Sequence, residues 1–116
     1  MIAHVVLFEP KASIPAAGRK EFLEEIRSVA RNIPTIVQAR IGTTISIGLM
    51  PETNRGQKTY RYAAIFEFAT RGDLAAYFIH PVHDRLRAIF WDLCQATLIA
   101  DVELFDPSSS VADNLV

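Results

Sequence analysis

Six stretches of the chain carry a clear hydrophobic period, and the order in which strand-like and helix-like stretches follow one another leaves few possible folds. Strand-like runs, in which apolar side chains alternate or occupy both faces, lie at residues 2–8, 37–47, 60–68 and 97–105. A run with apolar residues at every third or fourth position separates the first two strands and ends at Pro34. A second helical region, broken at His80-Pro81, separates the last two.

The helix signals are specific enough to place helix boundaries. Ser13 is expected to cap the first helix, with Pro15 in its first turn. Thr70, followed three residues later by Asp73, matches a capping box. Pro81 can occupy the first position of a new helix, so the second helical region should form two helices. The resulting order, β-α-β-β-α-β with a broken second helix, predicts an α+β ferredoxin-like fold around a four-stranded antiparallel sheet.

The length fits one domain, expected over residues 1–106. Residues 107–116 begin with a proline and three serines and are expected to form a loose C-terminal tail. Residues 48–59 carry Pro51 and Gly56 and few apolar anchors, so we predict that they form the most mobile interior loop, near the mouth of a cavity.

The strands are more apolar than one small domain needs. Half of all residues are hydrophobic, and the runs at 2–8 and 60–68 are apolar on both faces although the helices can cover only one. Because a large apolar sheet face is rarely open on a soluble monomer, a second copy of the chain is the expected cover. We therefore predict a homodimer joined through the sheet face opposite the helices. Two such sheets form a barrel of about eight strands, which can hold one small ligand between the subunits.

Composition excludes several other classes of protein. Twelve basic and thirteen acidic residues leave a net charge of −1, and no Lys/Arg run exceeds two, which does not fit nucleic-acid binding. The apolar runs are too short for a membrane span, and the N-terminus lacks the pattern of an export signal. Cys94 is the only cysteine, so we expect a buried structural thiol in a reducing, cytoplasmic compartment.

Three places in the sequence resemble the stress-responsive A/B barrel family, the dimeric α+β barrels. They are a histidine early in the first strand, His4; the run from Tyr77 to His83, which contains His-Pro-Val-His; and an acid in the closing strand, Asp101. The resemblance covers about residues 1–106 and implies the fold and the dimer. Most members of this broad family have no assigned activity, and one branch is a plant polyketide cyclase, so fold transfers better than activity.

The resemblance implies two catalytic residues. In the cyclase-like branch, the histidine matching His83 acts as general base and the tyrosine matching Tyr77 assists at the substrate carbonyl. His83 would lie in the first turn of the helix that Pro81 opens, where the positive helix end favours a neutral ring. A tyrosine hydroxyl can donate to a developing negative oxygen. Alternatively, Tyr77 is an ordinary aromatic residue of the core.

Four further residues are candidates for contact with a ligand. His4 shares a strand face with apolar residues only, so it is either a polar group in an apolar cavity or a core histidine bonded to backbone. His80 either reaches the cavity or caps the new helix. Tyr62 and Phe66 lie on the aromatic face of the third strand and complete the predicted ligand site.

The chain also departs from the cyclase pattern. That enzyme uses a tyrosine on its first helix and a histidine on its third strand, where this sequence has Ile26 and Tyr62. Three dispersed histidines do not make a metal site, although His80, His83 and Asp84 could hold an ion weakly. We predict neither a metal nor a cofactor.

Four functions remain open. The first is a dimer that binds a small apolar or aromatic molecule with weak catalysis or none. The second is a cofactor-free acid/base enzyme acting on a polyketide-like or β-dicarbonyl substrate, and the third is a cofactor-independent monooxygenase. The fourth is a purely structural or stress-protective role. Acid/base chemistry requires that His4, Tyr77 and His83 reach one common substrate.

Overall fold

The computed structural model of the chain describes residues 1–45 and 59–115. Its elements follow the predicted order and are β1 (Ile2–Pro10), α1 (Ala16–Asn32), β2 (Ile36–Thr43), β3 (Tyr62–Phe68), α2 (Arg71–Ile79), α3 (Pro81–Leu93), β4 (Cys94–Glu103) and a short 3-10 helix, η1 (Ser110–Leu115). The fold is α+β and ferredoxin-like, with the second helix broken into α2 and α3, which confirms the prediction from the order of the apolar periods.

The four strands form one antiparallel sheet in the order β2-β3-β1-β4. In this sheet His4 of β1 lies opposite Phe66 of β3 on one side and opposite Asp101 of β4 on the other. Because directly opposite residues point to the same face of a sheet, these three side chains share a face.

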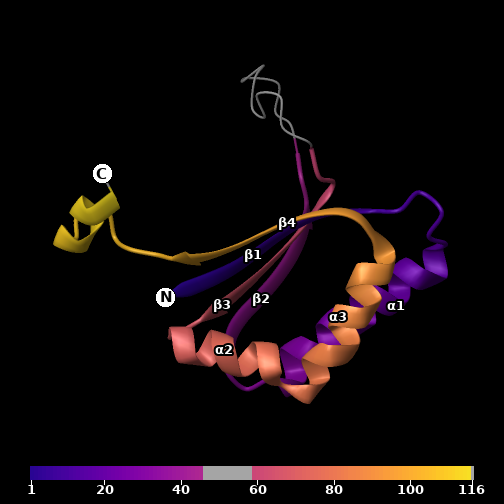
Figure 1. Cartoon of the computed structure of the whole chain (residues 1–116), viewed down its shortest axis with the longest axis horizontal. Helices are drawn as coiled ribbons and strands as arrows, with labels where there is room; N and C mark the ends of the chain where they lie inside the picture. The colour runs from indigo at the N-terminus through magenta and orange to yellow at the C-terminus, as the bar shows by residue number, and fades with distance from the viewer. Residues whose placement is uncertain (46–58, 116) are drawn as a thin grey trace.

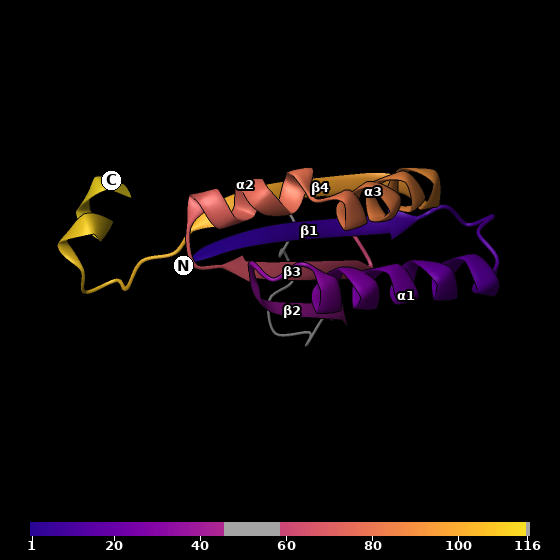
Figure 2. The ribbon, with the colours of Figure 1, turned by 90° about the horizontal axis from the view of Figure 1, so that it is seen from below.

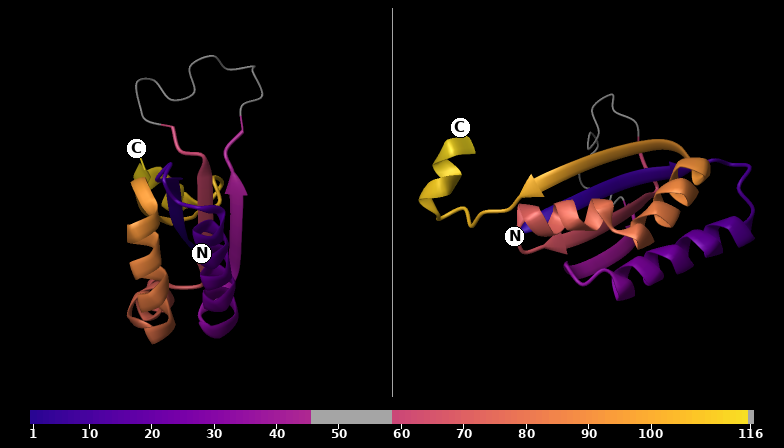
Figure 3. Two further views of the ribbon diagram at one scale, coloured as in Figure 1. Left: turned by 90° about the vertical axis from the view of Figure 1, so that its right-hand side faces the viewer. Right: turned by 60° about the horizontal axis from the view of Figure 1, so that its bottom comes forward.

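All three α-helices lie on the same side of the sheet (Figure 1). Helices α1 and α3 run side by side over it (Figure 3), and Arg85 of α3 bonds Glu25 of α1 at 2.5 Å and Glu21 at 3.1 Å. Figure 2 shows α2 and α3 on the β1–β4 side and α1 on the β2–β3 side. The core lies between these two layers, so the helices cover the sheet face that carries His4 and Phe66.

This placement settles a question that the sequence left open. The face of β1 that carries His4 could line a space between two subunits or lie in the core of one chain, and the helices of the same chain cover it, so that His4 and Phe8 are buried. Any cavity beside His4 therefore lies within one chain. The sequence could not decide this because both faces of β1 are apolar, so the alternation does not show which face the helices cover.

The helix boundaries follow local hydrogen bonds. The hydroxyl of Thr70 accepts from the backbone N–H of Asp73 at 3.1 Å, so the predicted cap of α2 is confirmed. The predicted cap at Ser13 is wrong, because α1 begins only at Ala16 with Pro15 at its N-cap and no side-chain cap. The N–H of Ile14 donates to the carbonyl of Lys11, so a turn occupies the position where the helix was expected to begin.

Strand β2 differs from its predicted pattern. Ile36 lies opposite Phe68 and Ala39 lies opposite Phe66, so one extra residue sits between them as a β-bulge. The bulge turns Val37 out to solvent, although simple alternation placed it on the same face as Ala39. Of the loop predicted over residues 48–59, all but Thr59 lies outside the described residues.

The other face of the sheet carries no helix within the described ranges, 1–45 and 59–115. By register, this face also carries Glu9 and Glu67, and its apolar side chains from β1, β3 and β4 include Ala3, Val5, Leu7, Ala63, Ile65, Leu98, Ala100 and Val102. We call this set the open face. Ile65, Leu98 and Val102 are exposed on it although they are large and apolar.

The chain beyond β4 extends away from the sheet (Figure 1). The N–H of Leu104 still donates to the carbonyl of Met1 at 2.9 Å, and Asp106 then accepts from the N–H and the hydroxyl of Ser108 in a turn. The expected loose tail thus contains the 3-10 helix η1. None of the helices in the described part of the chain is long and apolar enough to cross a membrane.

Candidate functional site

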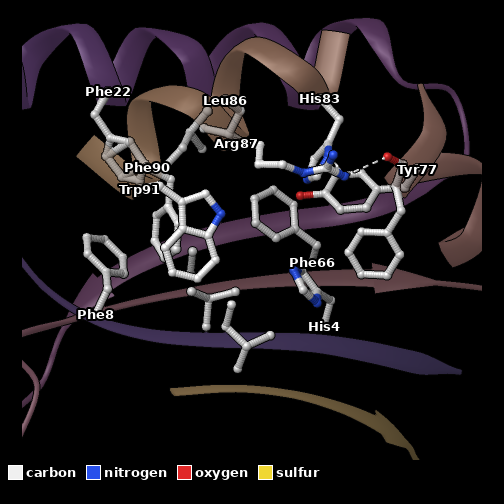
Figure 4. A pocket seen from close by; sticks show the side chains of 15 residues that line it. His4, Phe8, Phe22, Phe66, Tyr77, His83, Leu86, Arg87, Phe90 and Trp91 are labelled. Atoms are coloured by element: carbon white, nitrogen blue, oxygen red, sulfur yellow. Dashed lines mark hydrogen bonds between the residues drawn. The ribbon is translucent and has the colours of Figure 1, made fainter. Parts of the chain in front are cut away.

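A cavity of about 210 Å³ lies between the sheet and the helices (Figure 4). Most of its wall is apolar, with side chains from β1, β3, α1 and α3 that include Val6, Phe8, Phe22, Ile26, Phe66, Phe90 and Trp91. The polar side chains in the wall are His4, Tyr77, His83 and Arg87. A mostly apolar pocket with a few converging polar groups is the usual composition of a small-molecule site.

Three residues singled out from the sequence meet in this cavity. The ring centroids of His4 and Tyr77 are 5.7 Å apart, and those of Tyr77 and His83 are 4.5 Å apart. Their exposed fractions are 5%, 1% and 8%, respectively. The break at His80 makes this possible, because it lets α2 deliver Tyr77 and α3 deliver His83 to the same side of the sheet.

His4 is held by an acid from the neighbouring strand. Its Nδ1 lies 2.5 Å from Oδ1 of Asp101, directly opposite on β4. An ionised carboxylate only accepts hydrogen bonds, so Nδ1 carries the hydrogen. The ring also packs edge-on against Phe78, with centroids 5.1 Å apart. Asp101 therefore fixes the ring so that Nε2 is the nitrogen available on the cavity side.

His83 has a different partner. Its Nδ1 lies 3.3 Å from Nη2 of Arg87, which also donates to the backbone carbonyl of Phe78 at 3.1 Å. A guanidinium only donates, so Nδ1 of His83 accepts and the hydrogen of the neutral ring is on Nε2. Burial, then the charge of Arg87 and the proximity of His4, lower the pKa of His83 to about 4, while Asp84 and the Phe78 carbonyl act in the opposite direction. His83 is therefore a neutral hydrogen-bond donor near pH 7 and a weak base.

Tyr77 contributes a hydroxyl to the cavity, beside the Arg87 guanidinium (Figure 4). Burial raises the pKa of the phenol above its usual value, although Arg87 acts in the opposite direction. The hydroxyl is therefore protonated at neutral pH. Within residues 1–45 and 59–115 no side chain or backbone group bonds it. Tyr77 can thus donate this hydrogen to a ligand.

The remaining candidates divide into two groups. Phe66 lines the cavity and packs against His4 and Tyr77, with centroid distances of 6.1 Å and 5.6 Å. Tyr62 stacks on Phe8 and lines a second cavity of about 340 Å³ between α1, β2 and β3. The Nδ1 of His80 accepts from the N–H of Val82 at 3.1 Å, so this side chain caps α3 and is not part of the cavity wall.

Sequence reasoning missed two residues of this site. Arg87 follows His83 by one helical turn, and i, i+4 residues share a helix face, but the same pattern fits a solvated arginine. Asp101 drew attention only as an acid in the closing strand, because its partner depends on the register between β1 and β4. In the part of the chain that the structure describes, no three His, Cys, Asp or Glu side chains cluster as metal ligands would.

Comparisons with known proteins agree with this architecture. The stress responsive A/B barrel domain matches residues 2–104. A protein from Arabidopsis thaliana is 19% identical, covers 94% of this chain and 100% of its own, and superposes with a TM-score of 0.78. Among curated proteins, none matches the sequence of this chain.

Two other solved structures share the fold. A dimeric ferredoxin-like protein of unknown function from Bacteroides fragilis is 22% identical, with 89% and 95% of the two chains covered and a TM-score of 0.66. A hydroxynitrile lyase from Passiflora edulis is 16% identical, with 90% and 96% covered and a TM-score of 0.72. At these identities the likeness establishes a common fold.

Proposed function

Since this chain belongs to the stress-responsive A/B barrel family, we propose that it works as a homodimer in which each subunit binds one small, mainly apolar molecule in the cavity beside His4, Tyr77 and His83. The observation that carries this proposal is the cavity itself, an apolar space into which buried polar groups converge. The hydroxyl of Tyr77 makes no hydrogen bond to the described residues, so it can bond a ligand that enters the cavity.

The volume limits what the ligand can be. A cavity of about 150 Å³ in another protein holds a benzene molecule. The 210 Å³ found here suits one aromatic ring or short alkyl chain with a small polar substituent. This size favours a compact ligand over an extended polyketide chain.

The open face supports the dimeric part of the proposal. Large exposed apolar patches on soluble proteins mark interaction sites, and two-fold homodimers are the commonest oligomers. The solved relative from Bacteroides fragilis is described as dimeric. Since the cavity of this chain lies on the helix side of the sheet, the dimer would support each site without contributing its walls.

Ligand binding can be measured through Trp91, the only tryptophan, which lines the cavity and is 56% exposed. Titration with hydrocinnamyl alcohol should shift its fluorescence to shorter wavelength with a saturable curve, because the ligand displaces water from the ring. Ala64→Leu, which fills part of the cavity, should weaken binding by about ten-fold, since overpacking costs on the order of 1–3 kcal/mol. Ala88→Leu makes the same change on the exposed side of α3 and should have no effect. A folded protein that shows no saturable change would contradict the proposal.

A second candidate function, cofactor-free acid/base catalysis, is favoured by the convergence of His4, Tyr77 and His83. His4 is the better general base of the two histidines, because Asp101 holds its Nδ1–H and leaves Nε2 to accept a proton. Nδ1 of His83 is already bonded to Arg87. Tyr77 and the Nε2–H of His83 would then donate to the oxygen on which negative charge develops.

Proton exchange offers a test that needs no natural substrate. With phenylacetone in heavy water, His4 would take a proton from the carbon beside the carbonyl, and a deuteron would return to the same carbon. We expect exchange above the buffer rate by NMR, and a loss of about 100-fold in His4→Ala, as for a general base. His80→Ala should exchange at the wild-type rate, because His80 is outside the cavity wall. Exchange no faster than in buffer would rule out this candidate and leave the binding proposal intact.

A further inference from the structure

Arg87 is the only charged side chain in the cavity wall among the described residues. It lies on α3, one turn after His83, and 49% of its side chain is exposed, so it is near the opening of the cavity. The wall contains no aspartate or glutamate from these residues. One fixed positive charge therefore faces a mostly apolar space, in which the other polar side chains are His4, Tyr77 and His83.

The charge of Arg87 is not paired with a carboxylate as closely as those of Arg71 and Arg85 are. Arg85 bonds Glu25 at 2.5 Å, and Arg71 bonds Glu103 at 2.6 Å. Arg87 instead donates from Nη2 to a neutral carbonyl and a neutral ring. Its nearest carboxylate oxygen, Oδ1 of Asp84, is 4.0 Å from Nη1, beyond hydrogen-bond distance, and belongs to a side chain that is 71% exposed. The guanidinium thus retains donors for another acceptor.

The neutral polar groups beside Arg87 also offer hydrogens. The hydroxyl of Tyr77 lies beside the guanidinium and has no bond to the described residues, and the neutral ring of His83 carries its hydrogen on Nε2. Three donors from three residues converge at one end of the cavity. Phe8, Phe22 and Ile26 form an apolar wall elsewhere in it.

We propose that the ligand of this cavity is a small amphipathic carboxylate, whose anionic head is bound by Arg87 and Tyr77 and whose apolar body lies against the phenylalanine side chains. This inference rests on the proposed function, because it specifies the ligand of the same site. Guanidinium and carboxylate form strong, directional hydrogen bonds. A single arginine neutralises one negative charge, which fits a monocarboxylate better than a doubly charged phosphate ester.

A structural role for Arg87 is the alternative, since its bond to the Phe78 carbonyl ties the end of α2 to α3. Arg87→Gln separates the two roles, because an amide can still donate to that carbonyl but carries no charge. Arg31→Gln, at the exposed end of α1, is the matched control.

Hydrocinnamate and hydrocinnamyl alcohol are suitable probes, because they share one apolar body and differ in the head group. By Trp91 fluorescence at neutral pH, the wild-type protein should bind the carboxylate at least about ten-fold more tightly than the alcohol, because hydrogen bonds between charged groups are stronger than those between neutral groups. Arg87→Gln should abolish this preference and leave the affinity for the alcohol within about two-fold, since the apolar contacts do not change. Arg31→Gln should behave as wild type.

The outcomes distinguish the carboxylate inference from the binding function on which it rests. Equal affinities in the wild-type protein, or a carboxylate preference that persists in Arg87→Gln, would overturn the carboxylate inference while the binding function stands. If Arg87→Gln weakens both probes equally, Arg87 acts through the structure and the inference is wrong. If neither probe binds the wild-type protein, the proposed function fails as well.

Discussion

Ile65→Lys is expected to convert a dimer of about 26 kDa, twice the chain mass of 12.9 kDa, into a monomer. Ile65 lies in the open face, opposite Val5 of β1, and is 37% exposed in the single chain. In an isolated subunit, a lysine at this position could extend its ammonium group into water. In the proposed interface the same group would lose its contact with water among apolar side chains of both subunits, at a cost of several kcal/mol.

Size-exclusion chromatography with light scattering at micromolar concentration measures this change. Ile79→Lys is the matched control, because Ile79 is 83% exposed at the end of α2, on the helix side of the sheet. The Ile79→Lys variant should remain a dimer. A wild-type particle of 13 kDa, or equal masses for the two variants, would show that the open face is not the interface.

The second large effect concerns acid stability. The pKa of His83 is lowered from the ordinary histidine value of 6.5 to about 4 in the folded protein, chiefly by burial and then by Arg87 and His4. Below pH 6.5 the unfolded chain therefore binds a proton at this residue that the folded chain does not, and folding becomes less favourable as the pH falls toward 4. Above pH 6.5 the ring is neutral in both states and has no effect on the pH dependence.

Urea unfolding at pH 7 and at pH 4.5, compared between wild type and His83→Gln, isolates this contribution. Between these two pH values, the free energy of unfolding should fall by about 2 kcal/mol more in the wild-type protein than in the variant, because one pKa unit corresponds to about 1.4 kcal/mol. Glutamine does not titrate, so the other acids and bases, including Asp84 and Asp101, cancel in the comparison. Equal losses would mean that water reaches His83 and that its pKa is ordinary.

The sequence predicted the order of elements because hydrophobic period and capping are local properties. The cap at Thr70 and the break before Pro81 depend on neighbouring residues only, and both are in the structure. It could not show which face of β1 the helices cover, since both faces are apolar. The contacts of the site could not be predicted from local patterns either. The contact between Tyr77 and His83 depends on the angle between two helices, and that between His4 and Asp101 on the register of two strands.

Only one residue, His80, separates α2 from α3, so the connection between these helices cannot absorb a change in its length. Each residue of an α-helix turns the chain by about 100°. A single insertion or deletion between Tyr77 and His83 would therefore rotate one side chain out of phase with the other and direct it away from the cavity. The spacing of six residues between Tyr77 and His83 is therefore required for the two side chains to meet. In other chains of this fold, a tyrosine and a histidine at the same interval across a proline break identify which sequences can assemble the same pair of donors.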